Sequence, residues 1–134
     1  MSEEFDALVT ALKSLEQPLE LEQPLEAATT GEDPETVTLP MAEDEWNTRP
    51  DAVSYGTVRL DFEADALRGD DVKNNTAYEG SVDLYSMARG GAGWVELITQ
   101  TLTEHCGAAW SLNAHLYERE TGLFHWEWAF QVED

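Results

Sequence analysis

Basic residues are scarce in this sequence. Its 134 residues include 7 lysines and arginines against 28 aspartates and glutamates, which gives a formal net charge of −21. Tight binding to nucleic acid draws on cationic side chains that displace counterions from the phosphates, and anionic membranes attract the same side chains. The charge balance therefore argues against direct, tight binding to DNA and against attachment to a membrane surface.

Cysteine and long apolar runs are also lacking. The single cysteine, Cys106, has no partner for an intrachain disulfide, and no paired-cysteine spacing suggests a zinc site. No run of about eighteen apolar residues occurs, and residues 1–10 are acidic where a signal peptide has lysine or arginine. We therefore expect a soluble protein without a visible export signal and without a metal or cofactor.

The length and composition predict a single domain over residues 1–134. Apolar residues make up 42% of the chain and include five tryptophans, which is enough large side chain for a packed core. Residues 18–50 are rich in Thr, Glu, Asp and Pro, and we expect an extended loop or linker there, with one short strand around Val37 to Met41. The motif EQPLE occurs at 16–20 and again at 22–26, too few copies for a repeat architecture.

Two segments have the apolar spacing of an amphipathic helix. The first covers Glu3 to Glu16 and stops before Pro18, because proline has no amide hydrogen and disfavours helix in the residue before it. The second begins at Trp94 and ends near Gly107. The apolar positions that recur at helical spacing are Phe5, Leu8, Val9, Leu12 and Leu15 in the first segment and Trp94, Leu97, Ile98 and Leu102 in the second.

Four further segments alternate between apolar and polar residues, as half-buried strands do. They are Tyr55 to Phe62, Tyr78 to Met87, Ala109 to Glu118 and Leu123 to Glu133. The first two are separated by a turn-rich connection, Ala64 to Asn75, and the last two by a short turn, so each pair predicts a hairpin. The order α-β-β-α-β-β predicts an α+β fold, an antiparallel or mixed sheet with helices packed on one face.

The residues that carry chemistry do not form a catalytic or metal-binding pattern. His105, His115 and His125 are spaced ten apart, which matches no ligand motif, although a turn near residue 120 would bring the last two opposite each other. Residues 90–93, Gly-Gly-Ala-Gly, lack the Lys-Ser or Lys-Thr ending of a phosphate-binding loop and indicate a strand-to-helix joint. Cys106 adjoins His105 in sequence only. We therefore predict that the protein is not an enzyme.

The last strand carries an unusual row of aromatic residues, which supports two interpretations. They form the sheet core beneath the helices, or part of the row contacts a neighbouring subunit. Core is the stronger interpretation for most of the row. The candidate residues for a subunit interface are Trp46, Trp126 and Trp128.

Two stretches resemble a known family. Residues 78–86, YEGSVDLYS, lie before the second predicted helix, and residues 117–128 read YERETGLFHWEW. Together with the chain length, the acidity and the order of elements over residues 3–133, they resemble the tail terminator (tail completion) proteins of siphophages and related prophages. The resemblance implies a hexameric ring that caps the tail tube, ends tube polymerisation and presents a surface to the head–tail connector, without catalysis.

The resemblance also implies a place and partners. The protein would belong to the tail or neck of the virion after assembly in the host bacterial cytoplasm, and its partners would be other copies of itself, the tail tube protein and the head–tail connector protein. DNA would pass through an acidic lumen without specific binding. The polar segment between the central strands is then a candidate contact with the next ring, through Arg68, Asp70, Asp71, Lys73, Asn74 and Asn75.

Two other classes of protein remain open. One is another head–tail connector or neck subunit, which would share the fold class and the ring. The other is an acidic DNA mimic, whose carboxylates imitate phosphates and block a basic DNA-binding protein. Assembly separates the classes, because a mimic stays monomeric or dimeric and a terminator forms rings.

Overall fold

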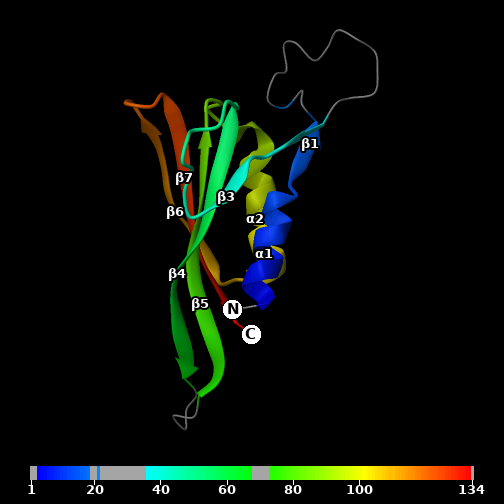
Figure 1. Ribbon diagram of the computed structural model, residues 1–134, viewed down its shortest axis with the longest axis vertical. Coiled ribbons are helices and arrows are strands. Elements are labelled where there is room, and N and C mark those ends of the chain that lie inside the picture. The colour runs from blue at the N-terminus through cyan, green and yellow to red at the C-terminus, as the bar shows by residue number, and fades with distance from the viewer. Residues whose placement is uncertain (1–2, 19–20, 22–35, 68–72, 134) are drawn as a thin grey trace.

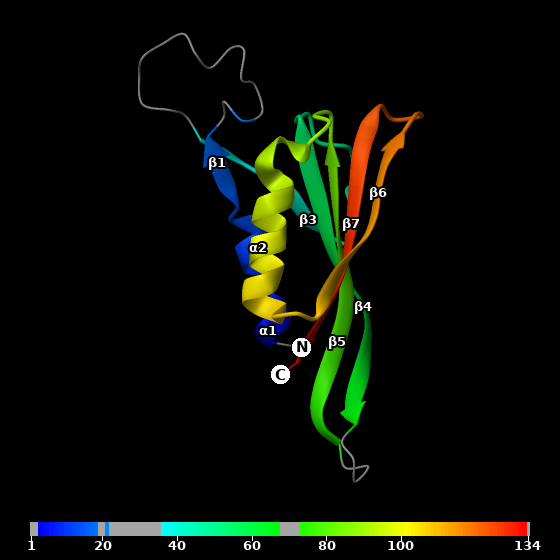
Figure 2. The same ribbon diagram turned by 180° about the vertical axis from the view of Figure 1, so that it is seen from behind.

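A two-layer α+β structure is formed by residues 3–18, 21, 36–67 and 73–133, which the computed structural model describes, with the backbone alone for 62–67 and 73–76. A five-stranded mixed sheet forms one layer, and two α-helices form the other. Both helices cover the same face of the sheet (Figures 1 and 2). The predicted α+β class is confirmed. Neither described helix has the length and apolar character needed to cross a membrane.

Helix α1 covers Glu3–Lys13 and turns its apolar stripe towards the sheet, with Phe5, Leu8, Val9 and Leu12 buried. It ends before the predicted boundary at Glu16. The reason is a tertiary contact: Glu16–Pro18 forms strand β1, which pairs antiparallel with β2, Thr36–Thr38. Strand pairing therefore competes with the helical pattern at this end.

The one short strand predicted around Val37 to Met41 is in fact two strands in different sheets. Strand β2 ends at Thr38, and strand β3, Met41–Glu43, joins the main sheet parallel to β4. Between them the Leu39 N–H donates to the carbonyl of Leu15, and the Pro40 carbonyl accepts from the Gly56 N–H. Residues 39–40 thus link the small sheet to the large one.

The main sheet has the order β3-β4-β5-β7-β6, and every pair except β3–β4 is antiparallel. Its long strands are β4 (Ser54–Leu67), β5 (Lys73–Ser86), β6 (Trp110–Glu118) and β7 (Leu123–Glu133). Strands β4 and β5 occupy much of the connection that was predicted over Ala64 to Asn75. The predicted order α-β-β-α-β-β needs correction, because it omits three short strands that depend on partners far away in sequence.

A 3-10 turn, η3 (Gly91–Gly93), leads into α2 (Trp94–Cys106). Its residues Gly91, Ala92 and Gly93 have positive φ values of 78°, 53° and 87°. Residues other than glycine rarely adopt this backbone conformation. A Cβ on Gly91 would also lie 2.6 Å from a methyl carbon of Val95. The joint predicted from the glycines therefore has a defined conformation.

The core lies between the helices and one face of the sheet. Trp94, Ile98 and Leu102 of α2 are fully buried, and so are Val82 and Trp128 of the sheet. The register explains how they meet: Val82 lies opposite Trp128, and Leu84 opposite Trp126, so even-numbered residues of β5 and β7 share this face.

Candidate functional site

The three tryptophans predicted at a subunit interface do not come together. Trp126 is 3% exposed and Trp128 is fully buried, and both belong to the core beneath the helices. Trp46 instead packs edge-on against Tyr55, with ring centroids 6.4 Å apart, and its indole N–H donates to the Gly56 carbonyl at 2.9 Å. Their burial favours the core interpretation for Trp126 and Trp128. Trp46 lies in the connection between β3 and β4, and its contacts hold this connection against β4.

The predicted inter-ring segment is described only in part. Arg68, Asp70 and Asp71 lie outside the described residues, whereas Lys73, Asn74 and Asn75 form the first residues of β5. The hairpin of β4 and β5 extends beyond the ends of both helices (Figures 1 and 2). Its distal half therefore stands away from the helical layer.

The face of the sheet opposite the helices carries an aromatic and polar row. Tyr55 stacks on Tyr85 with ring centroids 5.2 Å apart, and Tyr85 stacks on His125 at 4.3 Å. These residues come from β4, β5 and β7. Burial raises the pKa of Tyr85 to about 12, and the neighbouring carboxylates of Asp83 and Glu118 contribute to the same shift.

His125 lies between two carboxylates. Its Nε2 is 2.7 Å from an oxygen of Asp83, and its Nδ1 is 3.1 Å from an oxygen of Glu118. The hydrogen bond to Asp83 is the main cause that raises the pKa of His125 above 6.5, against an opposing effect of burial. Asp83 is only 4% exposed, so the charged imidazole compensates a carboxylate that has little access to water.

The strand registers explain why the contacts of His125 with Asp83 and Glu118 were not predicted. His125 lies opposite Leu116, and His115 lies opposite Trp126, on which it stacks at 4.6 Å. His115 and His125 therefore do not meet across the hairpin. The partner of His125 is Asp83 on β5, and only the pairing of two strands that are distant in sequence brings these residues together.

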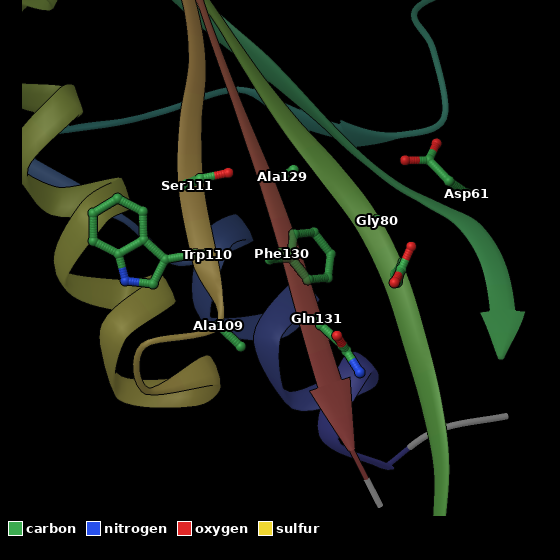
Figure 3. A pocket seen from close by; sticks show the side chains of 9 residues that line it. Asp61, Gly80, Ala109, Trp110, Ser111, Ala129, Phe130 and Gln131 are labelled. Carbon is green, nitrogen blue, oxygen red and sulfur yellow. The ribbon is translucent and has the colours of Figure 1, made fainter. Parts of the chain in front are cut away.

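A shallow groove of about 350 Å³ crosses the lower part of this face, where β6 begins beside β7 (Figure 3). Its polar lining residues are Asp61, Glu79, Ser111 and Gln131. Asp61 is already engaged, because it accepts from Arg59 at 2.8 Å and from the Ser81 hydroxyl at 3.2 Å. The Trp110 indole points towards α2, where its N–H donates to Thr103 at 3.0 Å.

Strand β6 forms a margin of the sheet, and among the described residues no strand pairs with its outer side. Leu112, Leu116 and Tyr117 are 46%, 47% and 51% exposed. Residues 105–117 contain no Asp, Glu, Lys or Arg, although the whole chain carries 28 acidic residues. The sequence pattern predicts this strand correctly, but it does not show that the strand lies at an edge, because strand order depends on the tertiary fold.

Comparison with known proteins adds no family to this description. No protein-family model matches the chain, and no curated protein is significantly similar to it. In the described part of the chain, no three His, Cys, Asp or Glu side chains are grouped as metal ligands would be. The β6 edge is the candidate contact surface, because it combines exposed apolar side chains with a strand that has no charged residue from Trp110 to Tyr117.

Proposed function

We propose that the protein is a structural subunit of a siphophage tail, a tail terminator that assembles into a hexameric ring. The observation that carries the proposal is the exposed edge strand β6, which has no charged residue from Trp110 to Tyr117 on a chain with a net charge of −21. Edge strands of proteins that stay monomeric are commonly protected by charged residues. An unprotected edge on so acidic a chain favours a subunit that assembles with partners.

The resemblance of residues 78–86 and 117–128 to tail terminators supplies the identity of the assembly. In this role the ring caps the tail tube, stops its polymerisation and offers a surface to the head–tail connector. No catalysis is involved, and the protein resides in the tail or neck of the virion after assembly in the bacterial cytoplasm. The dense negative charge lets DNA pass through the ring without binding.

The protruding β4–β5 hairpin is the proposed contact with the neighbouring ring or tube. It extends beyond the helices (Figure 1), and in the sequence its two strands are joined by a polar segment that includes Arg68, Asp70 and Asp71. Replacing residues 68–72 by a short glycine-serine turn should leave the subunit folded and abolish binding to tubes. Unchanged tube binding by this variant would remove the hairpin from the proposal.

The decisive experiment is the solution mass by light scattering, at low and at high salt, with negative-stain images of the main species. Rings are expected to form more readily at high salt, because salt screens repulsion between acidic subunits. Addition of purified tail tube protein should then give tubes capped at one end. Rings that bind connector but never tube would indicate another neck subunit.

The acidity favours a second candidate, a DNA mimic that blocks a basic DNA-binding protein. Such a protein stays monomeric or dimeric at every salt concentration and binds a basic partner with strong salt dependence. A strict monomer that leaves tube growth unaffected would replace the terminator proposal by this one.

A further inference from the structure

Among the described residues, the main sheet ends at β6 on one margin and, on the other, at the short strand β3 and the part of β4 that lies beyond it. The two long free edges are therefore β6 and the distal part of β4. Strand β3 pairs with β4 only at Gly56 to Val58, so among the described residues β4 beyond Val58 is paired on one side alone, with β5. Figure 2 shows β6 at one margin and the lower part of β4 in the hairpin that extends from the sheet. Each chain thus offers two unpaired rows of backbone N–H and C=O groups.

The charges of the two edges differ. The free part of β4 carries Arg59, Asp61, Glu63 and Asp65, whereas β6 carries no charged residue from Trp110 to Tyr117. Pairing β4 with β4 would place acidic residues against acidic residues, which destabilises a sheet. Pairing β4 with β6 limits this repulsion to Glu118 at the end of β6 and also covers the exposed Leu116 and Tyr117.

From these observations we infer that β6 pairs with the free edge of β4 in a second copy of the chain, so that neighbouring subunits share a continuous sheet. The choice of a head-to-tail contact rests on the proposed ring, because a β6–β6 contact uses the same surface twice and ends at a dimer. A head-to-tail contact pairs both β6 and the distal part of β4 in every subunit, and it can repeat around a ring. The β-bulge between Leu112 and Ala114 limits the regular part of the contact to Ala114–Glu118.

A crosslinking experiment tests the partner edge directly. All variants carry Cys106→Ser, so that the native thiol does not react. One preparation contains Ala114→Cys, Leu116→Cys or Tyr117→Cys on β6, and the other contains Asp61→Cys on β4. The two are mixed at high salt with a short bismaleimide. The expected result is a β6–β4 product in the mixture, with one β6 position giving the highest yield, and little product from either preparation alone.

A second pair of variants tests whether the exposed side chains contribute. Leu116→Glu should weaken association by about tenfold or more, because it removes an apolar contact and places a charge on the edge. Met87→Glu is the matched control, since Met87 is 54% exposed and lies outside β6. Circular dichroism and thermal unfolding establish that both variants are folded.

The outcomes separate this inference from the proposed function. A β6–β6 product, or no product in any mixture while tubes are still capped, would overturn the edge pairing and leave the terminator proposal standing. A β6–β4 product in a protein that does not bind tubes would support the edge pairing and overturn the terminator proposal. Equal weakening of association by Leu116→Glu and Met87→Glu would also count against the edge.

Discussion

The two faces of the main sheet come from the same strands and have different chemistry. On the helical face, Trp126 and Trp128 are buried under α1 and α2 with other apolar side chains. On the opposite face, His125 of the same strand binds Asp83 and Glu118 and stacks on Tyr85. The difference indicates a division of roles: the first face supplies most of the stability, and the second is held by directional polar contacts and is free of helices.

The sharpest way to break the helical face is Trp128→Ala. Trp128 is fully buried in the core, so its truncation should lower the free energy of unfolding by about 3–5 kcal/mol. Urea denaturation followed by circular dichroism measures the change.

Trp128→Phe is the control for this variant. The indole N–H of Trp128 has no hydrogen-bond partner in the described part of the chain, so phenylalanine removes an unpaired polar group while it fills much of the space. We expect it to cost less than half as much as alanine. An equal cost for the two variants would mean that packing volume does not dominate at this position.

Gly80→Ala tests how closely β5 packs on its neighbours. A Cβ at Gly80 would collide with the Arg59 carbonyl oxygen and would lie 2.7 Å from the Phe130 ring. We expect a loss of about 1–3 kcal/mol from overpacking, measured by urea denaturation. Gly90→Ala is the matched control, because a Cβ there meets nothing within 4 Å, and a similar loss in both variants would contradict the close-packing argument.

His125→Gln tests the polar face. Because Asp83 raises the pKa of His125 above 6.5, the charged imidazole stabilises the fold fully below pH 6.5, and this contribution is lost as the pH rises through the folded-state pKa. We expect the variant to be less stable than the natural chain by about 1.5 kcal/mol near pH 5.5, with a smaller difference near pH 8.5.

Thermal unfolding at the two pH values measures this difference. His115→Gln is its control, since His115 stacks on Trp126 and is not paired with a carboxylate in the contacts described above. A stability difference for His125→Gln that is the same at both pH values would exclude the proposed contribution of the charged imidazole.

Leu116→Ala should have the smallest effect on the isolated subunit. Leu116 is 47% exposed, so its truncation should change the free energy of unfolding by less than about 0.5 kcal/mol. Leu84→Ala, the same substitution at a fully buried position, should cost about 2–5 kcal/mol. The measurement is made on dilute monomer, and a large loss for Leu116→Ala would mean that β6 contributes to the core rather than to contacts.

Periodicity predicted the parts of the fold that depend on local sequence. The apolar stripes of α1 and α2 and the alternation of β7 follow from residues that lie close together in the chain, and their types were assigned correctly. Strands β1, β2 and β3 were not predicted as three strands, because each has only three residues and forms through a distant partner. Helix α1 was extended too far for the same reason.

The candidate sites were harder to predict than the elements. The contact of His125 with Asp83 spans 42 positions and needs the β5–β7 register, which alternation alone does not give. The edge position of β6 needs the strand order of the whole sheet. Trp126 and Trp128 belong to a row with two open interpretations, and only the placement of the helices shows that they are buried.

The small β1–β2 ladder makes the segment between its strands a permissive place for insertions. Pro18 lies opposite Thr36, so the two ends of the segment are held together whatever its length. Each doubling of the number of residues between two paired strands costs only about 0.6 kcal/mol of closure entropy. The second EQPLE copy falls entirely between these strands. A duplication there therefore adds residues without changing the register of the β1–β2 pair. An epitope tag placed at the same point should leave the core and both edges of the main sheet intact.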